Sequence, residues 1–497
     1  MLRKRTPNMA TEPTIFEKSR VGRVGVQMPV ADVPVAPVSE LLPGVRLRAS
    51  IAFPELTEGD VMRHYLRLSQ KNYCVDKGFY PLGSCTMKYN PKVNDVAVLM
   101  PGFSRVHPFQ PEETVQGTLQ ILFDMQNWLR AILGMDAVSL QPAAGAHGEL
   151  LGLMLIRAYH THRGEGHRNL ILVPTAAHGT NPASAVRCGY KTVPIGTDAR
   201  GLTDMDDLAR QIAACGNNLA GMMLTNPNTV GLFEEDIVDI CRLVHDAGGQ
   251  MYCDGANMNA LVGTACPGDM GFDVMHVNLH KTFSVPHGGG GPGSGPVGVK
   301  AHLAPFLPVP VVIRDEEGMY RLNYSLPYTI GKVGPYYGSY LAVVRSWAYI
   351  AHFGKQNLHG ISEDAVLNAN YIRVELGKTL DIAYDRICMH EAVFTLKNLK
   401  ARTGVKALEV AKRIIDHGYH PPTMYFPLIV PECLMIEPTE TESRETIDDF
   451  IRAMVQIVEE CETDPETVKS APHTAEVGRI DEATAARNLD LSWPLGA

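Results

Sequence analysis

Residues 220–255, AGMMLTNPNTVGLFEEDIVDICRLVHDAGGQMYCDG, decide the fold of this chain. The apolar runs near the two ends, AGMMLT and QMYC, are short enough to be strands. Between them, EEDIVDICRLVHDAG has apolar residues at helical spacing. A strand that is followed by a helix and then by a second strand predicts a parallel pair with a crossover helix.

The same alternation extends to both sides of this unit. NLILVP (169–174) and TVPI (192–195) are further strand candidates separated by helical stretches, and another strand ends near Asn278. We therefore predict an α/β fold with a mostly parallel sheet covered by helices. Ligands gather beyond the carboxyl ends of such strands, so Asn226, Asp254 and the residues after Asn278 should lie at the functional site.

Three parts are predicted along the 497 residues, a length at which more than one domain is expected. Residues 1–60 are rich in proline and valine with little helical period, which indicates an extended arm of the kind that wraps a partner subunit. Residues 61–340 form the large domain. Residues 341–497 contain linker helices and a smaller α+β domain. One helix of that domain should pack through Leu408, Ala411, Ile414 and Ile415.

Composition excludes several classes of function. The formal net charge of -9 disfavours nucleic acid as a partner. The ten cysteines include no C-x-x-C pair, which favours free thiols in a reducing compartment over a zinc site or a disulfide framework. No export signal follows the basic residues near the start, and no apolar window is long enough for a membrane span. We expect a cytoplasmic enzyme that binds small molecules or proteins.

Lys281 is the first candidate for chemistry. It lies in HVNLHKTFSVPHGGGG, just after a strand candidate, next to His280 and before small residues. Partial desolvation there would lower the pKa of the amine and let it form an imine with a carbonyl compound. A surface lysine at the start of a loop is the commoner explanation when this residue is taken alone.

Asp254 is the second candidate, and it strengthens the interpretation of Lys281. It ends the strand of MYCDGANMNA, followed closely by Ala256, and would present a buried carboxylate at the edge of the sheet. The pyridinium nitrogen of pyridoxal 5′-phosphate needs such an anion to stay protonated. A turn or cap residue is the alternative for Asp254 alone. The pair, in this order along the chain, predicts a pyridoxal phosphate site with Lys281 as the Schiff-base residue.

Two other segments fit the same cofactor. In QPAAGAHGE, Gly145 and Ala146 stand at the start of a helix, where free N–H groups can hold a phosphate. His178, after the strand NLILVP, could stack on a cofactor ring, although a hydrogen-bonded loop histidine is the commoner explanation when this residue is taken alone. It has no second histidine or carboxylate at zinc spacing, so no metal site is expected. The glycine run 288–291 fits no nucleotide motif and is interpreted as a flexible loop beside the site.

With these residues in place, the sequence closely resembles the glycine cleavage system P-proteins, in the second subunit of their two-subunit form. The matching stretches are YPLGSCTMKYNPK (80–92), LQPAAGAHGE (140–149), PTAAHGTNPASA (174–185), DGANMNA (254–260) and NLHKTFSVPHGGGGPG (278–293). The resemblance implies fold type I of the pyridoxal phosphate enzymes. It implies that Lys281 carries the imine, that Asp254 faces the pyridinium nitrogen and that His178 stacks on the ring.

The resemblance also implies a cofactor-binding role for Gly145, Ala146 and Ala256, and contacts with the substrate or the lipoyl arm for residues of the YPLGSCTMK stretch. Those residues are Ser84, Thr86 and Lys88. The implied reaction is that of glycine dehydrogenase (decarboxylating): glycine loses carbon dioxide and its aminomethyl group passes to the lipoyl disulfide of the H-protein. His280, His178 or Lys281 would move protons. A companion first subunit would complete a heterotetramer, with the N-terminal arm at the interface.

Two alternatives stay open at the level of the residues. Another fold type I enzyme, such as a cysteine desulfurase or an aminotransferase, would share Asp254 and Lys281. A desulfurase also needs a reactive thiol, for which Cys85 and Cys266 are candidates by position only. The second alternative is a scaffold subunit without catalysis, which the presence of Lys281 disfavours.

Overall fold

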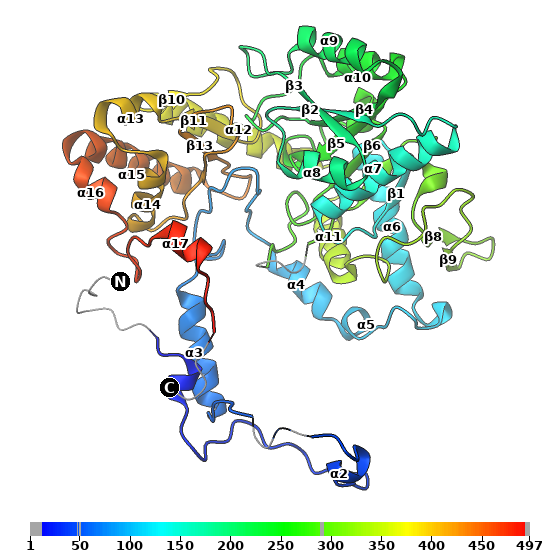
Figure 1. Cartoon of the computed structure of the whole chain (residues 1–497), viewed down its shortest axis with the longest axis vertical. Coiled ribbons are helices and arrows are strands. Elements are labelled where there is room, and N and C mark those ends of the chain that lie inside the picture. Colours follow the sequence, from blue (N-terminus) through cyan, green and yellow to red (C-terminus); the bar gives the residue numbers. More distant parts are fainter. Residues whose placement is uncertain (1–11, 47, 49–50, 289–292, 493–497) are drawn as a thin grey trace. The chain divides into compact units, whose positions relative to one another are not determined.

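The computed structural model describes residues 12–46, 48, 51–288 and 293–492 (Figure 1). They belong to two compact units: the described residues up to Cys74 together with those from Pro472 onward, and residues 75–471. None of the helices in the described part of the chain combines the length and hydropathy that a membrane span requires. The boundaries expected at 60/61 and 340/341 remain predictions.

The first unit contains helices α1 (Ile15–Lys18), α2 (Val38–Leu41), α3 (Glu58–Gln70) and α17 (Glu482–Arg487). Helix α3 begins at a capping box in which Thr57 and Asp60 satisfy each other's free N–H groups. Its one buried residue, His64, lies 3.2 Å from the Glu12 carboxylate. Between α1 and α2 the chain is irregular and exposes apolar side chains such as Val21 and Val30.

The second unit is built on a seven-stranded sheet. Its strands are β1 (Ala137–Ser139), β2 (Leu170–Pro174), β3 (Lys191–Ile195), β4 (Leu219–Thr225), β5 (Gln250–Gly255), β6 (Val274–Val277) and β7 (Val297–Val299). The spatial order is β1-β7-β6-β5-β4-β2-β3. The ladders from β6 to β3 are parallel, and both ladders of β7 are antiparallel. The predicted mostly parallel sheet is confirmed.

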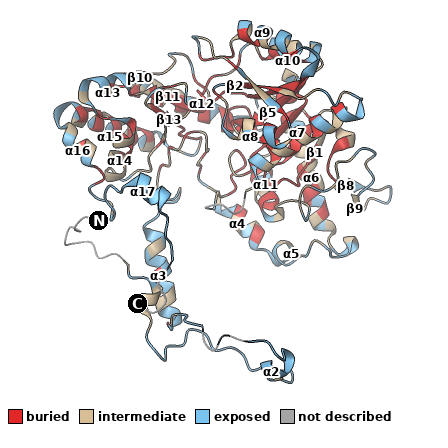
Figure 2. Cartoon of the chain, viewed as in Figure 1, coloured by how far each residue is buried: buried red, intermediate tan, exposed pale blue. Residues whose placement is uncertain are grey.

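Helices cover both faces of this sheet (Figure 1). They are α6 (Gln116–Leu133), α7 (Gly145–His162), α8 (Thr180–Arg187), α9 (Met205–Cys215) and α10 (Ile237–Asp246), and α11 (Tyr340–Phe353) packs against α6. Strand β4 shows why the interior has two parts, because Met222 and Leu224 belong to the cluster with α6, α9 and α10, whereas Met223 belongs to the cluster with α7 and α8. Successive side chains of a strand point to opposite faces. Because helices cover both faces of the sheet at β4, every residue of this strand is buried (Figure 2).

Shorter elements complete the large domain. Helices α4 (Lys92–Leu99) and α5 (Pro101–Ser104) precede α6, and strands β8 (Val311–Arg314) and β9 (Tyr320–Asn323) form a hairpin. Single turns of 3-10 helix occur at Glu112–Thr114, Gly216–Asn218, Met258–Ala260, Pro267–Met270 and Ala304–Phe306.

The smaller domain follows helix α12 (Leu358–Leu376). Its antiparallel sheet has the order β10 (Asp381–Ile382), β11 (Ala392–Thr395), β13 (Cys433–Ile436), β12 (Thr423–Met424). Helices α13 (Lys397–Thr403), α14 (Ala407–Asp416), α15 (Arg444–Thr463) and α16 (Pro465–Ser470) pack with it. The predicted inner face of α14 is right for Ala411 and Ile414, but Leu408 and Ile415 are only half-buried. Ala407 and Val410 take their places.

An early segment, residues 79–88, is built into this smaller domain. Phe79 lies in its core, and Leu82 forms a bridge with Ile436 at the edge of β13. Gly83 lies so close to Met435 that a Cβ atom would come within 2.3 Å of the Met435 Cγ atom. Only glycine fits at that approach. Residues 79–88, which come early in the chain, are therefore held by the smaller domain, which comes late in it.

Candidate active site

A cavity of about 450 Å³ opens where β4, β5 and β6 end. Thr225, Asp254 and Asn278, which end or follow these strands, all line it. The expected residues that line it are Ser84, Gly145, Ala146, His178, Asp254, Ala256, His280 and Lys281. Asn226, expected at the same edge, is not among the lining residues, and its Oδ1 accepts the N–H of Glu234 at 3.1 Å.

Asp254 is a buried carboxylate that stays ionised. The Asn181 amide donates to its Oδ2 at 2.9 Å and the Ala256 N–H donates to its Oδ1 at 3.0 Å. Burial by itself would raise the pKa of Asp254. The charge of His276, the Asn181 hydrogen bond and the charge of Lys281 outweigh burial and hold that pKa below its usual value. The cavity therefore offers a fixed negative charge at the end of β5.

His276 completes the surroundings of this carboxylate, and sequence reasoning missed it. The parallel register of β5 and β6 pairs Asp254 with His276, and the His276 Nε2 lies 3.4 Å from the Asp254 Oδ1. On the other side of the ring, Nδ1 lies 2.5 Å from the Tyr252 hydroxyl. His276 belongs to the predicted strand, but register is a tertiary property that no local pattern encodes.

Lys281 enters the cavity from the loop that follows β6. Its Nζ donates to the backbone carbonyl of Ser84 at 2.7 Å. Ser84 belongs to the segment that is built into the smaller domain, so the amine lies where the two domains meet. An amine and an ionised carboxylate, Asp254, thus line one cavity.

The histidines beside Lys281 are neutral at neutral pH. Burial, the nearby charge of His287 and that of Lys281 lower the pKa of His280 to about 4. Burial and Lys281 lower the pKa of His287 to about 4 as well, and the two rings are 5.2 Å apart. With so low a pKa, each imidazole is a weak base at neutral pH. The adjoining glycine run lies outside the described residues from 289 onward.

The first turn of α7 can hold an anion. Ala144, its N-cap residue, has extended backbone and no side-chain cap. The N–H groups of Gly145 and Ala146 at the start of a helix have no partner within the helix, and the helix dipole favours negative charge there. A Cβ atom on Gly145 would lie 2.7 Å from the Asn278 Nδ2. Because Gly145 has no side chain, the Asn278 amide can lie against the first turn of α7.

Two buried polar atoms at the cavity have no hydrogen-bond partner within the described residues: the Thr225 Oγ1 and the Asn278 Oδ1. Such atoms are uncommon in folded proteins, and the polar groups of a bound ligand would satisfy them. Together with the amine, the carboxylate and the helix N-terminus, they fit a ligand that carries an aldehyde, a basic ring nitrogen and a phosphate.

His178 lies at the mouth of the cavity with its ring exposed. Its Nδ1 accepts the N–H of Thr180 at 3.2 Å and lies 2.8 Å from the hydroxyl of that residue. The Thr180 hydroxyl donates in turn to Glu149 at 2.8 Å. Phe426 of the smaller domain meets the His178 ring edge-on at 5.6 Å. These contacts orient the ring, and its exposed position would let an aromatic ligand stack on it.

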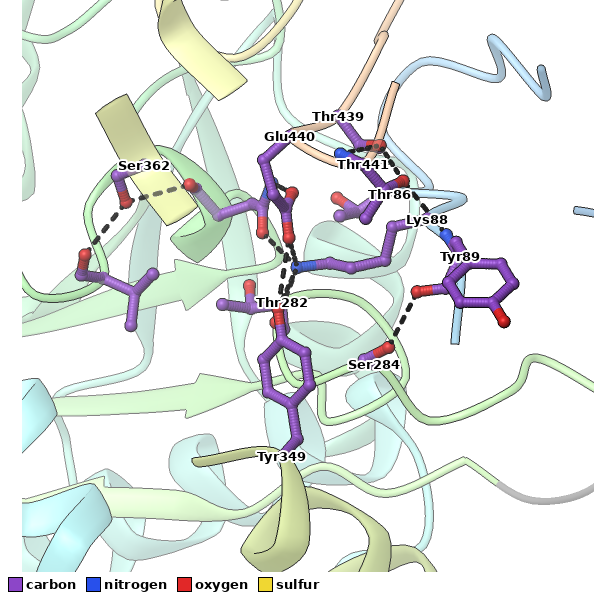
Figure 3. A network of polar contacts seen from close by, with 12 residues as sticks. Thr86, Lys88, Tyr89, Thr282, Ser284, Tyr349, Ser362, Thr439, Glu440 and Thr441 are labelled. Carbon is purple, nitrogen blue, oxygen red and sulfur yellow. Dashed lines mark hydrogen bonds and ion pairs between the residues drawn. The ribbon is translucent and has the colours of Figure 1, made fainter. Parts of the chain in front are cut away.

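The structure does not bring Thr86 and Lys88 to the cavity lining. The Lys88 ammonium is buried and donates to the Glu440 carboxylate at 2.6 Å, and to the Asn259 Oδ1 and the Thr282 carbonyl at 2.8 Å each (Figure 3). These partners lie in the loop after β5, the loop after β6 and the smaller domain. Lys88 therefore joins the segments that carry Asp254 and Lys281, and its contact with a substrate stays a prediction.

We expect Lys88→Met to destabilise the protein by about 3–5 kcal/mol, because it leaves the buried Glu440 carboxylate without its cation. The double variant Lys88→Met with Glu440→Gln should recover much of that loss in urea unfolding. An exposed pair serves as the control: Lys92→Met removes a contact with Asp76, both side chains being more than half exposed, and should cost less than about 1 kcal/mol. Equal costs for the two single variants would contradict the prediction.

A second buried group that sequence reasoning missed lies behind Ser84 and Thr86. His390, Glu391 and Glu437 are fully buried, and their nitrogen and oxygen atoms lie within 4.8 Å of one another. Glu391 accepts the Ser84 N–H at 2.8 Å, and Glu437 accepts the Thr86 N–H at 2.9 Å and its hydroxyl at 2.5 Å. Burial raises the pKa of Glu437 to about 7 and lowers that of His390 to about 3.

The raised pKa of Glu437 predicts a stability effect with a definite sign. The folded protein keeps this proton up to about pH 7, whereas an unfolded glutamate loses it near 4.5. Stability from this group is therefore present below pH 4.5 and lost as the pH rises through 7. Urea titrations should show this as a change in the free energy of unfolding of Glu437→Gln relative to that of the native protein. The difference should rise by about 3 kcal/mol in favour of the variant between pH 5 and pH 8.

Glu432→Gln is the matched control for this titration. The Lys400 ammonium and the Ala407 N–H lower the pKa of Glu432 despite partial burial, so its carboxylate is ionised in both states throughout this pH range. The free energy of unfolding of Glu432→Gln should therefore differ from that of the native protein by the same amount at every pH from 5.5 to 8. A flat difference for Glu437→Gln as well would overturn the prediction.

Comparison with known families agrees with this geometry. Residues 37–326 match the model of the glycine cleavage system P-protein, and residues 361–476 match that of the glycine dehydrogenase C-terminal domain. A probable glycine dehydrogenase (decarboxylating) subunit 2 from Chloroherpeton thalassium is 54% identical over 488 residues, covering 97% of this chain and 98% of the relative. One from Halalkalibacterium halodurans is 55% identical over 480 residues, covering 96% and 97%.

Solved structures share the fold. A crystal structure of glycine decarboxylase (P-protein) of the glycine cleavage system, in inhibitor-bound form, matches with a TM-score of 0.70 and 20% identity, covering 84% of this chain and 94% of that one. Mouse CSAD in apo form matches with a TM-score of 0.62 and 14% identity, covering 84% and 91%. At such identities the likeness establishes fold type I alone. The full-length sequence matches are decisive, and they show that the chain belongs to the glycine cleavage system P-protein family, among its glycine dehydrogenase (decarboxylating) subunits 2.

Proposed function

We propose that this chain is the catalytic subunit that decarboxylates glycine and passes the remaining aminomethyl group to the lipoyl disulfide of the H-protein. It would act together with a companion first subunit and with pyridoxal 5′-phosphate as cofactor. One observation carries the proposal: the Lys281 amine and the ionised Asp254 carboxylate share a cavity with the free N-terminus of α7. The family membership narrows the chemistry to glycine.

The residues that would hold the cofactor follow from this arrangement. Lys281 would bond to its aldehyde carbon, Asp254 would face the ring nitrogen, and His178 would stack on the ring. Gly145 and Ala146 would offer their N–H groups to the phosphate, with Ala256 beside the ring. When bound, pyridoxal phosphate supplies an electron sink for the negative charge that the departure of carbon dioxide leaves on the substrate carbon.

The protein's own groups set the conditions for that step. Asp254 stays negative because His276 and Asn181 support its carboxylate, so it can keep a proton on the facing ring nitrogen. The Ser84 carbonyl fixes the Lys281 amine when that amine is free. His280 lines the cavity, but its low pKa makes it a weak base, so Lys281 and His178 are the stronger candidates for moving protons. His178 and Phe426, whose rings meet edge-on, both line the cavity.

The desulfurase alternative finds no support in the thiols. Cys85 lines the cavity, but burial raises its pKa, so it is protonated at neutral pH. Cys266 does not line the cavity, and burial raises its pKa too. A nucleophilic cysteine requires the opposite shift. The alternative of a scaffold subunit conflicts with the presence of both Lys281 and Asp254 in one cavity.

The test is release of carbon dioxide from carboxyl-labelled glycine by the chain purified with its companion subunit. We expect fast release only when lipoylated H-protein is present, because the lipoyl disulfide accepts the aminomethyl group. H-protein without the lipoyl group is the control. The proposal fails if glycine is not turned over with lipoylated H-protein, or if cysteine gives sulfide at a higher rate than glycine gives carbon dioxide.

A further inference from the structure

Three glutamates of the smaller domain hold alternate residues of one segment at the cavity. Glu391 accepts the N–H of Ser84, Glu437 accepts the N–H and the hydroxyl of Thr86, and Glu440 accepts the ammonium of Lys88. More than 300 residues separate each donor from its acceptor. The segment therefore takes its position from the smaller domain, although it lies near the start of the chain.

The segment needs this support because its backbone is unfavourable. Ser84 and Thr86 have φ angles of 65° and 48°, in the left-handed region that residues with side chains rarely adopt. Such conformations persist where surrounding contacts determine them, and they concentrate at functional sites. Here the result is that the Ser84 carbonyl meets the Lys281 Nζ at 2.7 Å.

We propose that Glu391, Glu437 and Glu440 are positioning residues, which set the Ser84 carbonyl as the resting place of the Lys281 ammonium whenever that lysine is not joined to the cofactor. The inference rests on the proposed pyridoxal phosphate chemistry, in which Lys281 alternates between a bound and a free amine. A carbonyl oxygen that accepts a hydrogen bond from the free amine fixes the place of its nitrogen. Movement of the smaller domain would then change the support of that amine.

A metal ion at His390, Glu391 and Glu437 is the competing explanation, and the hydrogen bonds disfavour it. Both oxygens of Glu437 are taken by Thr86, and the Oε2 of Glu391 is taken by Ser84. Only the Glu391 Oε1 and the ring nitrogens of His390 lack partners in the described part of the chain. Two residues are fewer than the three protein ligands of a catalytic zinc site or the four of a structural one.

The protonation of the pair fits a positioning role. Burial and the charge of Glu437 raise the pKa of Glu391 well above its usual value. Burial raises that of Glu437 to about 7. A protonated carboxyl group still accepts a hydrogen bond, so the segment is held with less buried negative charge near Lys281. An acceptor oxygen is thus the property that each position requires.

The test compares Glu391→Ala with Glu391→Gln, which keeps an oxygen for the Ser84 N–H. We expect Glu391→Ala to raise the dissociation constant of pyridoxal phosphate, measured by visible absorbance, about tenfold. Its kcat for glycine should fall about tenfold, with the KM for lipoylated H-protein unchanged. Glu391→Gln should stay within about twofold of the native protein in all three measurements. Equal behaviour of the two variants overturns the proposal.

Glu442→Ala is the matched control, because this half-buried glutamate of the same domain makes no described contact with residues 84–88. It should leave cofactor binding unchanged. If Glu391→Ala does not fold in a thermal melt, Thr86→Val removes only the hydroxyl bond to Glu437 and should raise the same dissociation constant about threefold. Cofactor binding is measured without glycine, so failure of glycine turnover in the native protein would count against the proposed function and leave the positioning test intact.

Discussion

Lys281→Ala should lose the visible absorbance of bound pyridoxal phosphate and reduce release of carbon dioxide from glycine by at least about 10²–10⁴-fold, the range for removing a positioned acid–base group. The effect is large because one side chain has two tasks, bonding to the cofactor and moving protons. Its Nζ is fixed at 2.7 Å from the Ser84 carbonyl. In the alanine variant no amine takes the place of the Lys281 Nζ, and the Ser84 carbonyl loses this hydrogen-bond donor.

Two measurements establish whether the loss is specific. Borohydride reduction of the native protein followed by peptide mapping should place the cofactor on Lys281, whereas the variant should give no labelled peptide. Lys332→Ala, whose ammonium contacts the Tyr324 ring away from the cavity, is the control and should keep both absorbance and turnover. Persistence of the visible band in Lys281→Ala would contradict the catalytic assignment.

The large domain could be predicted because its signals are local. Each strand of the unit at 220–255 is a short apolar run and the helix between them has helical periodicity, so the alternation alone indicated β4, α10 and β5. Residues 112–133 also have apolar residues at helical spacing, which predicts a helix, but the helix starts one turn later, at Gln116, after a separate turn of 3-10 helix. Its end was predictable because Gly134 adopts the left-handed conformation of a C-cap.

The smaller domain shows where local reasoning ends. The face assigned to α14 was displaced by about one residue, because Leu408 and Ile415 are as apolar as Val410 and only packing against the sheet decides which side is buried. The apolar run MYFPL (424–428) predicts a strand, but the strand there is limited to Thr423–Met424, since Pro427 cannot donate to a ladder.

The residues of the candidate site also include some that local patterns predict and others that depend on contacts between distant parts of the chain. Asp254 and Lys281 could be predicted because each follows a strand and both belong to specific motifs. Glu391 and Glu437 could not, because their partners Ser84 and Thr86 are more than 300 residues away and no local pattern relates them. Lys88 belongs to a motif near the cavity, but a motif does not reveal which of its side chains face the ligand.

Asp254→Asn should lower the rate of carbon dioxide release by about 10²–10³-fold, comparable to removing one preorganised electrostatic group from an active site. The amide has nearly the same shape, so Lys281 should still bind the cofactor. What the variant lacks is the negative charge that His276 and Asn181 support. The amide of Asp254→Asn would offer no negative charge to keep a ring nitrogen of bound pyridoxal phosphate protonated, and the cofactor would then be a weaker electron sink.

Asp273→Asn is the matched control for this variant. Asp273 is also buried in the large domain, accepts the Met251 N–H at 2.7 Å and lies 2.7 Å from the His245 ring, but it does not line the cavity. It should lower the urea midpoint while leaving turnover of the folded protein within about threefold, since its partners are structural. Asp254→Asn should show the reverse: a retained visible band, a shifted absorbance maximum and a large loss in kcat. Equal losses of turnover in the two variants would mean that Asp254 acts through stability, and its assignment to the ring nitrogen would then be wrong.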